Sequence, residues 1–219
     1  MEIQITQDLV RKESITPNDA GCLKYIEDFL SERGFVNETL TYGRVKNLWS
    51  VKRNKGPLLV FLGHVDVVPT GPADQWEHNP FSGFDDGTFI NGRGTGDMKG
   101  GIACFMSALS RINVEDLNYS IGFLITADEE GPSKDGTVKV VEELMKRDEK
   151  IDYCLIGEPS TLETVGDNIR IGRRGSINIE LEVLGKQGHA AYPARVDNPI
   201  HKVVPFLDKL LSEVWDLSL

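Results

Sequence analysis

The 219-residue chain contains 40% hydrophobic residues, enough for one substantial core and a small second unit. Its formal net charge of −10 argues against the basic surface that binding to nucleic acid or to an anionic membrane requires. No apolar run approaches the length of a membrane span, and the three cysteines are widely spaced without a CxxC pair. We therefore expect a cytoplasmic protein with neither a disulfide framework nor a thiolate zinc site.

Helical and strand patterns alternate from the beginning of the chain. The turn-forming residues Pro17–Asp19 predict a helix start, and apolar residues then recur at helical spacing until Gly34. Three apolar or β-branched segments follow, and each is a predicted strand: 35–41, 48–52 and 58–62. The third of these is apolar throughout, which is typical of a strand buried on both faces.

A second series of elements follows the glycine-rich stretch 92–101. Apolar spacing predicts helices over 102–112 and 138–145, and the apolar runs 121–127 and 154–157 predict strands between and after them. Alternation of this kind indicates an α/β fold in which helices flank a mixed, largely parallel sheet. Ligands of such sheets gather at the carboxyl ends of the strands.

The pattern changes after Arg174. Apolar and polar residues alternate over 177–183, which predicts a half-exposed strand, and residues 200–214 form an amphipathic helical pattern. We therefore predict a metal-binding domain over 1–174 and the beginning of a small α+β domain over 175–219. One strand and one helix leave an apolar face that needs a partner, so dimerisation or further sequence is expected.

Acidic residues follow the apolar runs of three predicted strands, and one more lies in the glycine-rich stretch. They are Asp66, two residues beyond His64, after 58–63; Asp128, Glu129 and Glu130 after 121–127; Glu158 after 154–157; and Asp97 within 92–101. Carboxylates at the ends of buried strands are costly unless a positive partner meets them. One imidazole with several carboxylates suits zinc or a similar divalent ion. The sequence thus predicts a metal-dependent hydrolase.

Each of these features has a simpler interpretation. A single histidine at a strand end is more often a hydrogen-bonded polar residue than a metal ligand. For His64 the ligand role is favoured, because acidic residues follow three of the predicted strands. Residues 128–130 would also serve as an acidic cap at a helix N-terminus. The stretch 92–101 lacks both GxGxxG spacing and a lysine followed by Ser or Thr, which argues against a nucleotide loop. Arg173 could be a surface charge, and His189 a loop residue.

Six segments, in this order, resemble the motif series of the two-zinc aminoacylase and carboxypeptidase family. They are His64–Pro69, Gly92–Gly100, Asp128–Glu130, Gly157–Ser160, Gly172–Ser176 and Gln187–Pro193. The resemblance covers essentially the whole chain. It implies a zinc-exopeptidase-like catalytic domain, followed by the start of a lid domain that forms a homodimer.

The resemblance also implies a role for each metal-site residue. His64 and Glu158 would hold one zinc ion, Glu130 the second, and Asp97 would bridge ions that lie ~3.5–4 Å apart. Two zinc ions would occupy a complete active site, with Co²⁺ as a possible substitute. Asp66 would fix the tautomer of the His64 imidazole. Glu129 would be the general base that takes a proton from the attacking water.

Further residues are implicated outside the metal site. His189, donated by the other subunit of the dimer, would stabilise the oxyanion. Three residues match positions that hold the carboxylates of the substrate, namely Arg173, Ser176 and Tyr192. An arginine suits this task because its guanidinium group binds a carboxylate through two hydrogen bonds.

The details of the motifs are closest to family members that hydrolyse N-succinyl-L,L-2,6-diaminopimelate to succinate and L,L-diaminopimelate, in lysine and diaminopimelate biosynthesis. Two alternatives remain open. One is a related enzyme acting on acetylornithine or another N-acyl amino acid, and the other is a non-catalytic remnant. Family members are longer and supply a late histidine to the second zinc, whereas no histidine follows His201 here. We therefore expect the 219-residue chain alone to show little or no activity.

Overall fold

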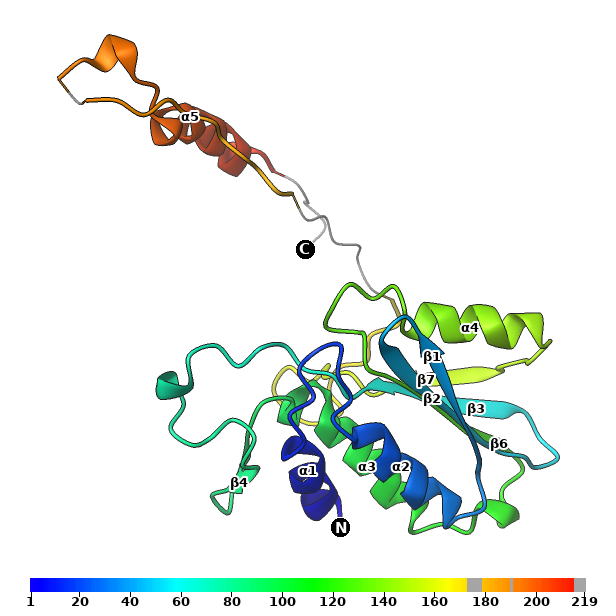
Figure 1. Cartoon of the computed structure of the whole chain (residues 1–219). Coiled ribbons are helices and arrows are strands. Elements are labelled where there is room, and N and C mark those ends of the chain that lie inside the picture. Colours follow the sequence, from blue (N-terminus) through cyan, green and yellow to red (C-terminus); the bar gives the residue numbers. More distant parts are fainter. Residues whose placement is uncertain (173–178, 190, 215–219) are drawn as a thin grey trace. The chain divides into compact units, whose positions relative to one another are not determined.

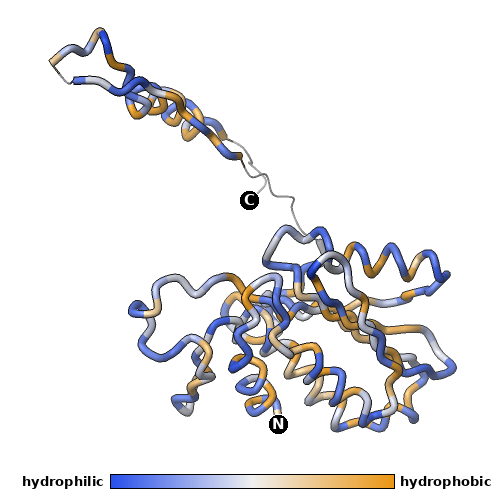
Figure 2. The backbone as a smooth tube through the Cα atoms, viewed as in Figure 1, coloured by the Kyte–Doolittle hydropathy of each residue, from blue (hydrophilic) through white to orange (hydrophobic). Residues whose placement is uncertain are grey.

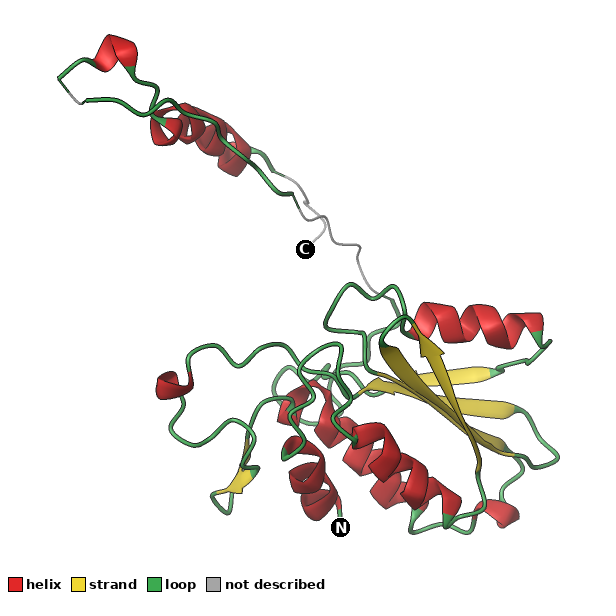
Figure 3. Ribbon diagram, in the orientation of Figure 1, coloured by secondary structure: helices red, strands yellow, loops and turns green. Residues whose placement is uncertain are grey.

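The computed structural model describes residues 1–172, 179–189 and 191–214. They fall into two compact units, Met1–Ile169 and Arg170–Leu219, which we describe separately. The first unit contains a five-stranded mixed sheet with helices on its two faces (Figures 1 and 3). The order of the strands across the sheet is β1 (Val36–Tyr42), β2 (Val45–Lys52), β6 (Ser120–Thr126), β3 (Leu58–His64) and β7 (Tyr153–Ile156). The expected mixed sheet flanked by helices is confirmed.

The candidate site lies at the carboxyl ends of the parallel strands of the sheet. Strand β3 pairs in parallel with β6 on one side and with β7 on the other, whereas β1–β2 and β2–β6 are antiparallel. In this register His64 lies opposite Thr126, and Leu62 lies opposite Ile156. The three strands therefore end at one edge of the sheet, where the residues that follow them converge.

Apolar side chains cover the two faces of the sheet. The larger core includes Phe61 and Phe123, whose rings meet edge to face with centroids 5.6 Å apart. It lies under three helices: α1 (Glu2–Val10), α2 (Cys22–Ser31) and α3 (Gly100–Leu109). On the other face, Trp49 and Val60 pack with Val140 and Leu144 of α4 (Thr137–Lys146). The residues Leu58–Leu62 of β3 are all apolar (Figure 2), as expected for a strand covered on both faces.

Two features near the N-terminus differ from the sequence analysis. Helix α1 was not predicted, although its buried residues Ile5 and Leu9 have helical spacing. Helix α2 begins at Cys22 rather than at Pro17–Asp19. The Asp19 carboxylate accepts a hydrogen bond from the Gly21 amide, and Gly21 adopts a φ of +82°. The expected capping residues therefore form a turn before the helix, and glycine suits the left-handed conformation that precedes it.

The second unit contains helix α5 (Pro199–Ser212), which confirms the amphipathic helix expected there. The Asn198 side chain caps it by accepting a hydrogen bond from the Ile200 amide at 2.9 Å. The predicted strand over 177–183 is wrong for its described residues 179–183, which lie outside any strand. A strand requires a hydrogen-bonded partner, and the described part of this unit contains only an isolated bridge between Lys186 and Asp197.

A short hairpin, β4 (Phe84–Asp85) and β5 (Ile90–Asn91), precedes the glycine-rich stretch. Single turns of 3-10 helix occur at Ala73–Gln75, Val114–Asp116 and Pro193–Arg195. Among the described residues, no helix combines the length and apolar character needed to cross a membrane.

Candidate metal centre

His64 is the last residue of β3, and its side chain is only 1% exposed. Its Nδ1 atom lies 2.9 Å from the backbone carbonyl oxygen of Asp66 and 3.6 Å from that residue's carboxylate. A carbonyl oxygen only accepts hydrogen bonds, so Nδ1 carries the proton and Nε2 is left for another partner. Because β3 ends at His64, Asp66 approaches the ring from the loop that follows the strand.

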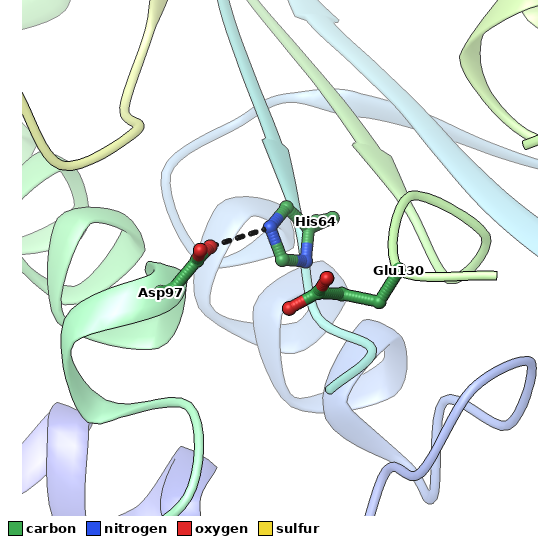
Figure 4. A group of neighbouring side chains, drawn as sticks. All are labelled: His64, Asp97 and Glu130. Carbon is green, nitrogen blue, oxygen red and sulfur yellow. Dashed lines mark hydrogen bonds and ion pairs between the residues drawn. The ribbon is translucent and has the colours of Figure 1, made fainter. Parts of the chain in front are cut away.

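Nε2 of His64 points into a group of carboxylates from separate segments of the chain. It lies 3.0 Å from Oδ1 of Asp97, 3.4 Å from Oε1 of Glu158 and 3.9 Å from Oε2 of Glu129. Figure 4 shows the ring facing Asp97, with Glu130 reaching toward the same space from the loop after β6. The expected convergence of strand-end acids is therefore present in the structure.

Two sets of side chains bring their ligand atoms within 4.8 Å of one another, and both include His64. One set adds Asp97 and Glu130, and the other adds Glu129 and Glu158. An imidazole nitrogen with carboxylate oxygens is a donor set that a divalent transition metal accepts. The residues therefore fit the metal ion that the resemblance implies.

Asp97 lies on an irregular helical segment, Thr95–Lys99, between the glycine-rich stretch and α3. Its φ of −124° and ψ of 98° depart from helical values and project its carboxylate out of the turn. The segment begins after Gly94, which has a φ of +81°. A methyl group on Gly94 would lie 2.4 Å from Cγ1 of Val67, so both the backbone conformation and the space require glycine.

The loop that carries Glu129 and Glu130 is organised by Asp128, which is 3% exposed. The Asp128 carboxylate accepts hydrogen bonds from three backbone amides of the same loop, at distances of 3.3, 2.9 and 2.9 Å; they belong to Ser133, Lys134 and Asp135. From its sequence, Asp128 was recognisable only as part of the acidic triplet 128–130. Its position directly after a buried strand was the one signal of this structural role.

Burial and neighbouring polar groups shift the pKa values of His64 and Glu130. Burial by itself would lower the pKa of His64, but its hydrogen bonds with Asp66 and Glu158 outweigh burial and raise the pKa to about 11. Burial also raises the pKa of Glu130, and the nearby charge of Asp97 adds to the rise. In the metal-free protein, protonated His64 thus supplies positive charge among these carboxylates. A bound cation would take over that function and require neutral His64.

The remaining predicted site residues belong to the second unit or to the undescribed part of the chain. Arg173 and Ser176 lie outside the described residues. His189 and Tyr192 are described, and their rings are 5.9 Å apart. Nδ1 of His189 accepts a hydrogen bond from the Ala191 amide at 3.1 Å. Nε2 of His189 is thus the nitrogen left for an interaction outside this loop.

A mixed open sheet whose parallel edge gathers an imidazole and several carboxylates is the architecture of a metal-dependent hydrolase. Comparison with known families agrees, because the model of Peptidase family M20/M25/M40 matches residues 60–218. The chain belongs to this family, and the use of a divalent metal ion follows from that membership.

Curated relatives match along nearly the whole chain. Succinyl-diaminopimelate desuccinylase of Hydrogenovibrio crunogenus is 51% identical over 217 residues, which is 98% of this chain and 57% of the relative. The protein of the same name from Marinobacter nauticus is 50% identical over 216 residues, with the same coverage of 98% and 57%. The chain thus spans 57% of the length of these relatives.

Solved structures share the fold at lower identity. A metallo-carboxypeptidase of the M20 family from Sulfolobus solfataricus is 21% identical, with a TM-score of 0.70 over 99% of this chain and 50% of its own. Human carnosine dipeptidase 1 is also 21% identical, with a TM-score of 0.65 over 73% of this chain and 38% of its own. At this level of identity the likeness concerns the fold alone.

Proposed function

We propose that this chain forms the metal-binding part of an amidohydrolase that cleaves N-succinyl-L,L-2,6-diaminopimelate to succinate and L,L-diaminopimelate. The substrate class is supported by the relatives at 51% and 50% identity, which carry the name succinyl-diaminopimelate desuccinylase. The hydrolytic chemistry is supported by one observation above all. Nε2 of buried His64 has carboxylate oxygens of Asp97, Glu158 and Glu129 within 3.9 Å.

We assign the metal ligands to His64, Asp97, Glu130 and Glu158. Zinc is the metal that suits this donor set, and Co²⁺, which accepts the same ligands, is the expected substitute. A complete active site would hold two ions with Asp97 between them. When bound, the metal supplies a Lewis acid for the amide carbonyl and lowers the pKa of water.

Glu129 is our candidate general base. Its Oε2 atom lies 3.9 Å from Nε2 of His64, and its side chain is 41% exposed, so it borders the metal site while facing solvent. In that position it takes a proton from the attacking water and then returns one to the leaving amine. Asp66 keeps this arrangement in place, because it contacts His64 and the backbone of the loop that carries Glu129.

The second unit would complete the site in a homodimer. We propose that His189 acts at the oxyanion of the other subunit, and that the substrate carboxylates are held by Arg173, Ser176 and Tyr192. Helix α5 has no buried residue, and it exposes Val204, Phe206, Leu207 and Leu211 among its apolar side chains. Such a face is suited to a subunit contact. The three free cysteines are consistent with a cytoplasmic location, which we also propose.

The proposal is tested by measuring zinc binding and hydrolysis with the same preparations. Zinc stoichiometry is determined by calorimetry, and hydrolysis is assayed on N-succinyl-L,L-2,6-diaminopimelate and on N-acetylornithine. The Hydrogenovibrio crunogenus relative serves as the positive control for the assay, and Glu129→Gln as the matched inactive variant. Zinc binding that depends on His64, with any turnover confined to the succinyl substrate, supports the proposal.

Two results would contradict it. Preferential turnover of the acetyl substrate would assign the chain to a different N-acyl amino acid. A chain that binds no zinc at His64 would be a non-catalytic remnant, whatever its fold.

A further inference from the structure

Lys99 is a buried cation that the proposed chemistry does not use. Its side chain is fully buried, with a relative exposure of 0%. Its Nζ atom donates hydrogen bonds to the backbone carbonyl oxygens of Leu9 and Lys12, both at 2.9 Å. These carbonyls lie at and just beyond the C-terminal end of helix α1, whose last turn contains no basic residue of its own. Lys99 therefore places hydrogen-bond donors at a helix C-terminus, where positive charge is favoured, while burial lowers the pKa of its amino group.

The same residue closes the turn that carries Asp97. The backbone amide of Lys99 donates a hydrogen bond to the carbonyl of Gly94 at 2.9 Å, which spans the irregular segment Thr95–Lys99. Lys99 is thus bonded to α1 through its side chain and to the start of the Asp97 turn through its backbone. Asp97 is only two residues from Lys99, so the carboxylate and the anchored lysine belong to the same short segment.

The neighbouring residue fixes the segment on its other side. Met98 is fully buried, and its sulfur accepts a hydrogen bond from the His64 amide at 3.3 Å. The methyl group of Met98 also lies close to Gly63, where an added side-chain carbon would be 2.7 Å away. The segment is therefore attached to β3 through Met98 and to α1 through Lys99, and the carboxylate of Asp97, the residue before Met98, lies 3.0 Å from Nε2 of His64.

We propose that Lys99 is a positioning residue, which holds the Asp97 carboxylate at the metal site by anchoring the Thr95–Lys99 segment to the C-terminal end of α1. The effect on metal binding rests on the proposed function, whereas the anchoring itself does not. The rival explanation is that Lys99 only contributes to the stability of the core. A positioning role predicts that a folded Lys99 variant binds zinc more weakly and exchanges its amide hydrogens faster near Asp97. A role in stability alone predicts neither change in a variant that is fully folded.

The test compares Lys99→Met with Lys99→Arg and with a matched control, Lys52→Met. Lys52 also donates from Nζ to a carbonyl just after a helix, that of Arg33 at 3.0 Å. It lies at the opposite end of the sheet, because it pairs with Ile121 near the start of β6. The control thus removes a similar contact far from Asp97.

Zinc affinity is measured by competition with a chelator, using the 219-residue chain. Loss of a residue that orients a metal ligand weakens binding roughly 10–100-fold, and we expect this for Lys99→Met. Lys99→Arg retains the charge and the donors and should recover most of the affinity, while Lys52→Met should stay close to the parent. Equal affinities for the parent and a folded Lys99→Met would overturn the proposal.

Hydrogen exchange followed by mass spectrometry provides a second readout. In the metal-free chain, Lys99→Met should speed exchange of the amides in 95–99 while leaving those of β6 protected. In the parent chain, zinc should slow exchange both in 95–99 and at the end of α1, because Lys99 links them. Zinc protection confined to 95–99 would contradict the anchor even if Lys99→Met fails to fold. Absence of zinc binding by the parent would instead refute the proposed function, and exchange of the metal-free variants would still decide the role of Lys99.

Discussion

The carboxylate of Asp66 accepts a hydrogen bond from the backbone amide of Glu130 at 3.0 Å. It also accepts from the Glu129 amide at 3.2 Å and lies 3.6 Å from Nδ1 of His64. A single buried side chain therefore joins the end of β3 to the acidic loop after β6. Burial by itself would raise the pKa of Asp66, but the His64 ring and the hydrogen-bond donors lower it, so this carboxylate stays ionised.

Replacement of Asp66 by asparagine tests this link. Asp66→Asn retains one acceptor oxygen but loses the charge opposite His64 and leaves the amides of Glu129 and Glu130 with one acceptor fewer. We expect zinc affinity to fall about 10–100-fold, as is typical when the partner of a metal ligand is changed. Calorimetric titration with zinc measures this. Asp86→Asn is the control, because the Asp86 carboxylate accepts hydrogen bonds from the backbone amides of Thr88 and Phe89 in the exposed hairpin. An equal loss of zinc affinity in the two variants would contradict the prediction.

Glu129 and Glu130 should separate chemistry from metal binding. In a form that turns over substrate, Glu129→Gln should lower kcat by roughly 10²–10⁴-fold because the amide cannot act as a base. In the 219-residue chain the same variant should keep its zinc affinity within a few-fold, whereas Glu130→Gln should weaken it. Parallel assays of turnover and zinc binding check the pair. If Glu129→Gln retained turnover, Glu129 would not be the general base.

The pH dependence of stability should reflect His64. The pKa of His64 rises from an ordinary value of 6.5 to about 11 in the folded, metal-free chain. Its stabilising effect is thus fully present below pH 6.5 and is lost as the pH rises through about 11. Urea unfolding of the parent and of His64→Gln, from pH 6 to 11, measures the difference. That difference should shrink toward high pH; a constant difference would show that protonated His64 does not contribute.

The affinity for zinc should also depend on the protonation of His64, and it should increase with pH. Zinc needs the neutral imidazole, so uptake displaces a proton from His64 and apparent affinity rises with pH below the raised pKa. Calorimetry in buffers of different ionisation enthalpy counts the released protons. His201→Gln, which changes an exposed residue of α5, is expected to release as many protons as the parent.

Asp128 offers a prediction about stability. Asp128→Ala leaves three amides of the acidic loop without their acceptor, and we expect the free energy of unfolding to fall by about 2–4 kcal/mol. Asp167→Ala is a close control, because the Asp167 carboxylate also accepts hydrogen bonds from three backbone amides. Asp167 lies in an exposed loop, so water can bind these amides once the carboxylate is removed. Urea unfolding of both variants distinguishes them. A loss for Asp167→Ala as large as that for Asp128→Ala would refute the buried role of Asp128.

The sequence predicted those parts of the site that depend on strand ends. Apolar runs followed by acids placed His64 and Glu158 at the edge of the sheet, because parallel strands end together. The run before His64 is a buried strand, as its sequence pattern indicates, whereas the residues of β7 before Glu158 are exposed. Lys99 and Asp128 escaped prediction. Their partners are backbone carbonyls and amides, which residue identity does not reveal; for Asp128 the one signal was its position after a buried strand.

The same limit explains the errors in secondary structure. Alternation of apolar and polar residues over 177–183 describes a surface that is half-exposed, but it does not supply the neighbouring strand that would make residues 179–183 part of a sheet. Helix α1 was missed because its buried side chains lie opposite α3, and a short amphipathic pattern indicates a helix only weakly without its packing partner.

The last prediction concerns the 219-residue chain by itself, which we expect to bind zinc but to hydrolyse the succinyl substrate poorly. Among the described residues, His64 is the only histidine in either metal-binding set, so a second ion has Asp97 and Glu130 as its proposed protein ligands. Fewer ligands mean weaker binding, and we expect one zinc ion to be retained firmly and the second to be lost on dilution. The proposed oxyanion contact from His189 also requires a second subunit, and loss of one such donor costs ~3–4 kcal/mol of transition-state stabilisation.

Metal analysis after gel filtration, together with the hydrolysis assay, measures both parts of this prediction. The Hydrogenovibrio crunogenus relative, of which the chain spans 57%, provides the reference rate under identical conditions. Added zinc in excess should raise occupancy of the second site without restoring that rate in the fraction that elutes as a monomer, because a monomer lacks the His189 of a second subunit. Hydrolysis by the chain at the rate of the relative, with two zinc ions retained per protomer, would show that His64 and the carboxylates around it form a complete centre.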